Sequence, residues 1–153
     1  NKNEADRAQQ RTKELLQLVV KGRGKEYANE DYNAVVARLS YEQGEPIDSL
    51  IVPRAIRSLV SGTNNYDYLI WIDVPSFRSN EIKEVVYTWP CPCFADAVHV
   101  GKEASLGFAF GYRGWSYCES ILIAVELIDG RKILRNFPSS SWDLGENAEP
   151  PKC

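Results

Sequence analysis

The pattern of hydrophobic and polar positions changes once along the chain, close to residue 63. Before this point apolar residues recur at helical spacing, whereas after it they alternate with polar or small residues, as in a strand. After residue 138 the sequence becomes polar and rich in serine and proline. We therefore predict three parts: a helical extension over 1–62, a β-sandwich over 63–138 and a flexible tail over 139–153.

The predicted helical extension contains two helices and one ambiguous segment. The helix over 4–20 has its apolar positions mainly in its second half, and glycines follow it and end it. Residues 30–42 fit either a helix or a strand, and the pattern does not decide between them. We predict a helix over 53–61 because Pro53 suits a first turn and Gly62 follows the last apolar residue.

Short segments rich in β-branched and aromatic residues fill the central part. The run Ser120–Ile128 is apolar on both faces, so we expect it in the middle of a sheet. Asp129 and Gly130 form a two-residue hairpin turn of the favoured type. Strands at about ten-residue spacing, with turn residues between them, predict a mainly β protein with an antiparallel sandwich. The predicted strands cover 66–74, 82–89, 106–112, 120–128 and 132–137.

Composition and charge exclude several functions. The chain has 153 residues, with 18 basic and 21 acidic side chains and a net charge of −3. A domain that coats nucleic acid needs a strong basic excess, so we expect no direct nucleic-acid partner. The longest apolar run, Ile121–Val125, has the length of a strand, and no segment approaches the ~18 residues of a membrane span.

Cysteine usage and the start of the chain add two expectations. The sequence has no signal-peptide core, so its four cysteines predict reduced thiols in a cytoplasmic protein. The chain contains no methionine, which leads us to expect that a further segment precedes Asn1 in the native protein.

Two cysteines and the single histidine invite a chemical interpretation. Cys91 and Cys93 are separated by one residue, and His99 follows in a segment, 97–100, with the pattern of a short strand. A reactive thiolate needs a cationic neighbour and an oriented base, but we expect His99 to point away from the cysteine loop. Zinc needs four ligands, and adding Cys118 completes no known ligand spacing. We therefore expect ordinary loop cysteines, with no metal and no cofactor.

Aromatic residues at strand ends are the more informative class. Phe94, Tyr112, Trp115 and Tyr117 all lie where a predicted strand gives way to a turn. One interpretation is that they pack at the edge of the core. The other is that two loops at the same end of the sandwich bring them together in a slot, which would bind flat or cationic groups by stacking and cation–π contact.

Residues 66–128 resemble the YEATS domain, and in particular its prokaryotic-type relatives, in the order of their signals. The aromatic-aliphatic run 66–74 and the strand 82–87 match two strands of the family. Pro90-Cys-Pro-Cys-Phe94 then stands where family members carry Leu-His-Pro/Glu-Ser/Thr-Phe, and Gly114-Trp-Ser116 stands where they carry Gly-Trp/Tyr-Gly. The resemblance implies an immunoglobulin-like sandwich. In eukaryotic members it would imply an acyl-lysine reader, and prokaryotic-type members are associated with signalling architectures.

Site residues follow from this resemblance position by position. It implies that Phe94 and Trp115 are the sandwiching aromatics and that Cys93 replaces the family's hydroxyl residue. Cys91 stands at the position of the family's histidine, and a thiol cannot make the hydrogen bonds of an imidazole. The candidate ligand-binding residues are Cys91, Cys93, Phe94, Tyr112, Gly114, Trp115 and Tyr117.

The leading hypothesis is a binding module without enzymatic activity. Its slot would take a modified, acyl-lysine-like side chain, a peptide or a small flat ligand, and its partner would be a protein or a modified peptide. One alternative is an adaptor or immunity-type protein that meets a partner through an acidic surface. The other is a cysteine-dependent enzyme that uses Cys91 or Cys93. The sequence leaves the oligomeric state open.

Overall fold

The computed structural model describes residues 41, 44–94 and 96–138. The helix predicted over 4–20, nearly all of the ambiguous segment and the tail predicted over 139–153 lie outside the described residues. Within them, no helix is long and apolar enough to cross a membrane.

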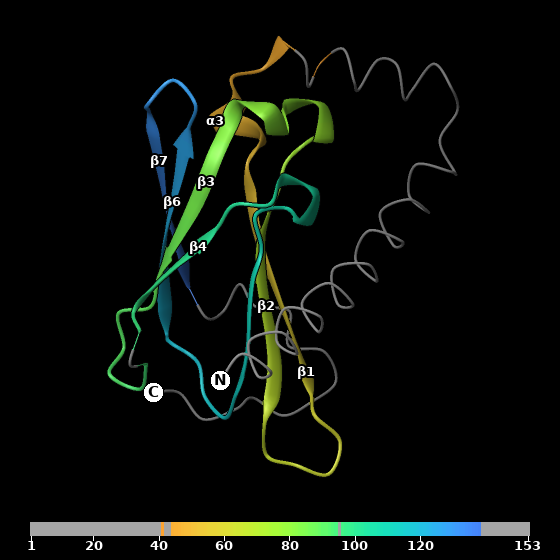
Figure 1. The fold of residues 1–153 in the computed structure, drawn as a ribbon, viewed down its shortest axis with the longest axis vertical. Helices are drawn as coiled ribbons and strands as arrows, with labels where there is room; N and C mark the ends of the chain where they lie inside the picture. Colours follow the sequence, from red (N-terminus) through yellow and green to blue (C-terminus); the bar gives the residue numbers. More distant parts are fainter. Residues whose placement is uncertain (1–40, 42–43, 95, 139–153) are drawn as a thin grey trace, which may run out of the picture.

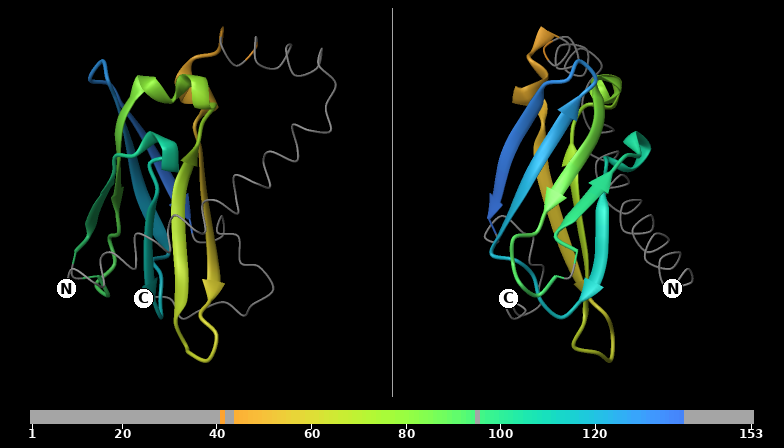
Figure 2. Two further views of the ribbon diagram at one scale, coloured as in Figure 1. Left: turned by 45° about the vertical axis from the view of Figure 1, so that its right-hand side comes forward. Right: turned by 60° about the vertical axis from the view of Figure 1, so that its left-hand side comes forward.

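Two antiparallel sheets pack face to face (Figure 1, Figure 2). The first has the order β1-β2-β5 and the second has the order β4-β3-β6-β7. The prediction of a mainly β, sandwich-type fold is therefore confirmed. The first sheet contains β1 (Val52–Leu59), β2 (Tyr66–Asp73) and β5 (Phe110–Gly114). The second contains β3 (Ile82–Thr88), β4 (Val98–Gly101), β6 (Ser120–Leu127) and β7 (Lys132–Pro138). Three helical elements are short: α3 (Ile47–Leu50) precedes β1, η1 (Ser76–Glu81) lies between β2 and β3, and η2 (Ala104–Leu106) lies between β4 and β5.

Four of the predicted strands, β2, β3, β6 and β7, form within two residues of their expected bounds. β6 lies between β3 and β7, as its two apolar faces indicated. A hairpin turn forms between β6 and β7, but the predicted two-residue turn at Asp129 and Gly130 is wrong. The loop has three residues, 128–130: the backbone N–H of Gly130 donates to the backbone oxygen of Leu127 at 3.0 Å, and Gly130, with a φ of 92°, takes the left-handed conformation that ends such a loop.

The helix predicted over 53–61 is wrong, because this segment is β1. It pairs with β2 over its whole length, from Val52 opposite Asp73 to Leu59 opposite Tyr66. β1 is an edge strand, where a proline such as Pro53 can be accommodated. The sandwich therefore begins before residue 63, and β1 is part of it rather than of a helical extension.

The strand predicted over 106–112 starts later than expected. η2 and a sharp bend occupy its first half, where Gly107 and Phe108 have φ values of 63° and 54°. A Cβ on Gly107 would lie 3.1 Å from the backbone oxygen of Ile72, so this glycine also allows the loop to approach β2 closely. The bend turns Phe108 into the core, where it is 1% exposed.

The space between the sheets is filled mainly by aromatic and branched side chains. Tyr87 is fully buried and donates a hydrogen bond from its hydroxyl to the backbone oxygen of Phe108 at 2.7 Å, which ties the second sheet to the loop before β5. Leu69 and Trp71 lie in a smaller cluster that Leu106 covers, so β2 is buried on both faces. The largest fully buried side chains are Trp89, Tyr68, Tyr87, Tyr117 and Phe108.

Candidate functional site

An open cleft of about 380 Å³ lies at the end of the sandwich where the β3–β4 loop meets the β5–β6 loop. Its size falls within the range of about 300–1,000 Å³ that is usual for small-ligand sites. The two loops come from different parts of the chain and lie at the end opposite η1 (Figure 1). The residues that line the cleft are Cys93, Phe94, Asp96, His99, Phe110, Tyr112, Arg113, Gly114, Trp115 and Ser116.

Phe94 is held in the β3–β4 loop by other rings. Its ring centre lies 5.2 Å from that of Trp89, which is fully buried, and 5.2 Å from that of Tyr112, which it meets edge-on at 89°. The backbone N–H of Trp89 donates to Ala97 across the base of the loop at 2.7 Å. Aromatic pairs of this geometry add about 0.5–1.5 kcal/mol beyond the burial of their area, so this wall is well supported.

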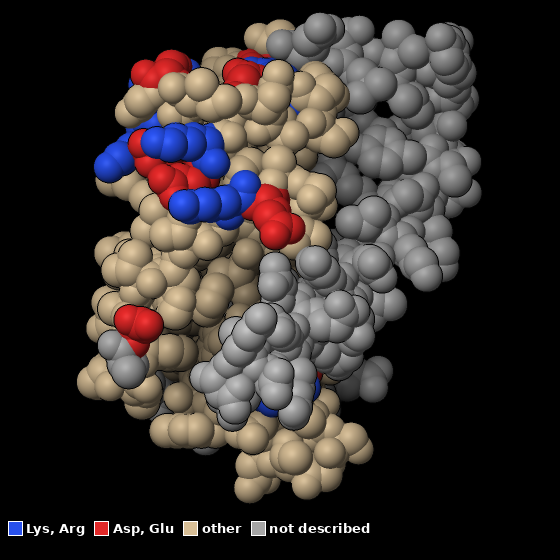
Figure 3. All heavy atoms as spheres, viewed as in Figure 1, with Lys and Arg blue, Asp and Glu red and all other residues tan. Residues whose placement is uncertain are grey.

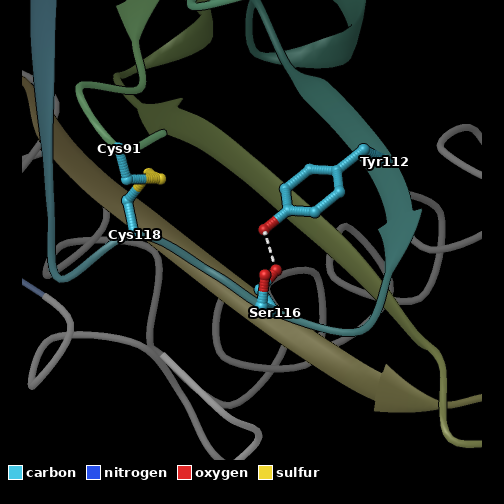
Figure 4. Close-up of a disulfide and its surroundings, with 4 residues drawn as sticks. All are labelled: Cys91, Tyr112, Ser116 and Cys118. Carbon is cyan, nitrogen blue, oxygen red and sulfur yellow. Dashed lines mark hydrogen bonds between the residues drawn. A yellow bond between two sulfur atoms is a disulfide. The ribbon is translucent and has the colours of Figure 1, made fainter. Parts of the chain in front are cut away.

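Tyr112 positions the opposite loop. Its ring stacks on Tyr68 at 4.5 Å, and its hydroxyl donates to the backbone oxygen of Ser116 at 3.1 Å, which closes the turn that carries Trp115 (Figure 4). Burial raises the pKa of the Tyr112 phenol well above its ordinary value, so the hydroxyl keeps its proton and remains a donor at neutral pH.

Trp115 differs from the other aromatic residues of the cleft because it is not part of the core. It is 54% exposed, whereas Trp89 and Tyr117 are at most 1% exposed. An exposed tryptophan in a cleft has a ring face that a ligand can cover. Gly114 beside it has no close approach of the kind seen at Gly107, since an added Cβ would make only ordinary contact with the ring of Tyr112 at 3.6 Å.

A disulfide joins the two cleft loops. Cys91 of the β3–β4 loop is bonded to Cys118 of the β5–β6 loop, with their Cα atoms 5.7 Å apart (Figure 4). Cys93 is also disulfide-bonded, and none of the cysteines in the described part of the chain is free. The prediction of reduced thiols is therefore wrong.

The charged groups of the cleft are unequal in their surroundings. Arg113 donates from Nε and an Nη to the two carboxylate oxygens of Asp67 at 2.7 and 3.2 Å, and Asp67 is 3% exposed. This bidentate pair links β5 to β2 and compensates the charge of Arg113. Asp96, in contrast, is exposed at the β3–β4 loop.

His99 also lies in the cleft, contrary to the expectation that it points away. β4 pairs with β3 so that His99 stands opposite Tyr87, which places its side chain on the inner face of the sheet. Its ring stacks on Phe110 with the ring centres 4.0 Å apart and the planes 13° from parallel. The alternation of Val98, His99 and Val100 was the signal for this, since the two exposed valines point outward and leave the histidine facing inward.

The structure brings most of the sequence-predicted site residues to one place. The predicted residues that line the cleft are Cys93, Phe94, Tyr112, Gly114 and Trp115. Two do not line it: Cys91 is bonded to Cys118, and Tyr117 is buried beside Tyr68. The lining residues absent from the sequence prediction are Asp96, His99, Phe110, Arg113 and Ser116. No cluster of three or more His, Cys, Asp or Glu side chains suited to a metal occurs among the described residues.

Comparison with known proteins gives one family. Residues 66–137 match the family model of the prokaryotic YEATS domain. The matched segment runs from the start of β2 into β7 and includes both loops of the cleft. No curated protein matches the chain.

Proposed function

The chain contains a domain of the YEATS family, a family of generally non-catalytic modules that bind modified peptides, and we propose that this domain holds a modified lysine side chain in the cleft between the β3–β4 and β5–β6 loops. The observation that carries the proposal is the exposed ring of Trp115 in a cleft that Phe94 also lines. An exposed aromatic ring in a concavity that other rings also line is typical of sites for small ligands or narrow side chains.

Rigidity of the loops supports this function. The Cys91–Cys118 bond fixes the separation of the two chain segments that carry Phe94 and Trp115. The hydrogen bond from Tyr112 to Ser116 fixes the turn itself. A cleft whose walls are already ordered loses little conformational entropy when a ligand enters.

The cleft departs from the family pattern at the histidine position. The resemblance puts Cys91 at this position, and Cys91 is bonded to Cys118. The imidazole that lines the cleft belongs to His99 of β4. The ligand would therefore meet an imidazole from a strand rather than from the loop, stacked on Phe110.

The cysteine-enzyme alternative meets a chemical obstacle. A thiolate is the reactive form of cysteine, and Cys91 and Cys93 are both disulfide-bonded. In this oxidised form neither residue can act as a nucleophile.

A peptide binding screen tests the proposal. Peptides that carry acylated, methylated or unmodified lysine are titrated against the protein, and a modified peptide should bind at least 10-fold more tightly than its unmodified form. Trp115→Ala should abolish that difference, whereas Phe77→Ala, which also removes an exposed ring but lies in η1 at the other end of the sandwich, should leave it unchanged. If Trp115→Ala binds every peptide as the parent protein does, the proposal fails.

A further inference from the structure

We propose that a second disulfide, between Cys93 and Cys153, holds segment 139–153 at the rim of the cleft, where this segment competes with ligands until the bond is reduced. The competition rests on the proposed function, since it concerns ligands of the same cleft, whereas the bond itself is independent of that function. Three observations carry the inference: the number of cysteines, the position of Cys93 in the cleft and the unequal exposure of the two bonds.

The number of cysteines assigns the partner of Cys93. The chain contains four cysteines. Cys91 and Cys118 are bonded to each other, and Cys93 is disulfide-bonded as well. Within the chain, Cys153 is the one cysteine left to be the partner of Cys93. The two cysteines of the β3–β4 loop therefore belong to two different bonds.

Segment 139–153 starts near the cleft. β7 ends at Pro138, which pairs with Ser120, and Ser120 follows Cys118 by two residues. The segment therefore leaves the sandwich at the end that carries the cleft loops. Its 15 residues span up to about 50 Å when fully extended, so the chain can reach Cys93 with ample slack.

The bond would bring the residues before Cys153 to the rim of the cleft. Cys93 is exposed and lines the cleft of about 380 Å³ together with Trp115. A disulfide keeps its two Cα atoms within about 7 Å and each further residue adds at most about 4 Å, so Pro151 would lie within about 15 Å of Cys93. A peptide that crosses the same rim has to displace these residues.

A covalent bond is the means that this surface offers for holding the segment. Charged side chains visible in Figure 3 gather mainly toward the opposite end of this face, away from the β3–β4 loop. Ion pairs on an exposed surface are also weak. The Cys93–Cys153 bond would therefore set the position of the segment, and its reduction would release the segment.

The two bonds differ in their access to a reductant. Cys118 is 1% exposed, whereas Cys93 is exposed. Thiol–disulfide exchange begins with attack of a thiolate on a sulfur, so a small thiol such as glutathione should reduce the Cys93–Cys153 bond first. One glutathione forms a mixed disulfide and a second displaces the remaining cysteine. The products are two cysteine thiols, which take up the two protons of the glutathione thiols, and one glutathione disulfide. The two cleft loops stay bonded to each other.

Peptide mapping of the oxidised full chain tests the bond. After cleavage at glutamates without reductant, the fragment with Cys153 should be linked to fragment 85–103, which contains Cys93. Cys93→Ser should release it and keep the link to Cys118, which is the internal control. Glutathione should free Cys153 at least 10-fold faster than Cys118. A free Cys153 thiol in the oxidised protein, a bond from Cys93 to a second copy or equal rates of reduction would overturn the inference.

Affinity for the peptide preferred in the screen tests the competition. Cys153→Ser, which spares the cleft-lining Cys93, should bind this peptide several-fold more tightly than the oxidised parent protein. Ser141→Ala keeps the bond and is the matched control, so its affinity should equal that of the parent. An unchanged or weaker affinity of Cys153→Ser would overturn the competition while leaving the proposed function intact. If the whole screen is negative, the proposed function fails and the competition fails with it, whatever the peptide map shows.

Discussion

Removal of the Cys91–Cys118 bond should destabilise the sandwich by a predictable amount. The bond closes a ring between two residues 27 positions apart. Without the cross-link the unfolded chain gains conformational entropy. For a ring of this size, the chain-entropy relation gives a decrease of about 3.5 kcal/mol in the free energy of unfolding. Against a typical domain stability of about 5–15 kcal/mol this is a large share, so the effect should be plain in equilibrium unfolding.

A double-mutant cycle isolates the bond from the packing of its residues. Cys91→Ala, Cys118→Ala and the double variant are unfolded in urea, and the free energy of unfolding is compared with that of the parent protein. Either single change already breaks the bond, so the free energy of unfolding of all three variants should fall by about 3.5 kcal/mol. The two variants that replace Cys118, which is 1% exposed, should lose slightly more because they also remove buried packing. The coupling energy of the cycle should therefore be about the size of the single losses.

Additive losses in this cycle would refute the reasoning, and so would a double variant destabilised by less than about 1 kcal/mol. Cys93→Ala, which removes the other bonded cysteine of the loop, should be additive with both single variants and serves as the control. The Cys91→Ala/Cys118→Ala variant should also bind the preferred peptide more weakly, because its two cleft loops are no longer fixed to each other.

Three further predictions concern the scaffold. Gly101→Ala should cost about 1–3 kcal/mol in urea unfolding, because its Cβ would lie 2.1 Å from the backbone oxygen of Phe108; a loss below 0.5 kcal/mol would contradict that close approach. Tyr87→Phe should cost about 1–3 kcal/mol because it leaves that same buried oxygen without its donor, and an unchanged urea midpoint would argue against the hydrogen bond. The hydrogen bond from Arg78 lowers the pKa of Glu81, so the pair's contribution is present above the ordinary pKa of a glutamate and is lost as the pH falls through the lowered value. Because Glu81 is partly exposed, this contribution is below about 1 kcal/mol, and Glu81→Gln should lose less stability than the parent protein between neutral and acid pH by that amount. A larger loss of stability in the variant than in the parent would contradict this sign.

The strands with a strong local composition could be predicted from the sequence. β2 and β6 are short apolar runs with many β-branched or aromatic residues, so their own residues determine their structure. β1 could not be predicted in this way. Pro53 and Gly62 stand where they would flank a helix, and the pairing with β2 that makes the segment a strand comes from outside it.

The candidate site, like the strands, could be predicted only in part from the sequence. The resemblance to a known family was enough to group Phe94 with Trp115, since both belong to loops with a recognisable order along the chain. The bond between Cys91 and Cys118 was not predictable, because its two residues meet only when the loops lie at the same end of the sandwich. The inward position of His99 depends on its register opposite Tyr87, which is likewise a property of the assembled sheet.

The crossover of the chain from β5 to β6 has a thermodynamic consequence. β5 belongs to one sheet and β6 to the other, so the turn with Trp115 joins the two sheets, whereas the loop with Phe94 connects two strands of the second sheet alone. A ligand that contacts Tyr112 and Phe94 together would therefore bridge the sheets and bind only the assembled sandwich. By mass action, such a ligand at 100 times its Kd adds about 2.7 kcal/mol to the stability of the fold. A rise in melting temperature consequently reports binding to the folded sandwich without any label, and ligands of every chemical class can be ranked by it.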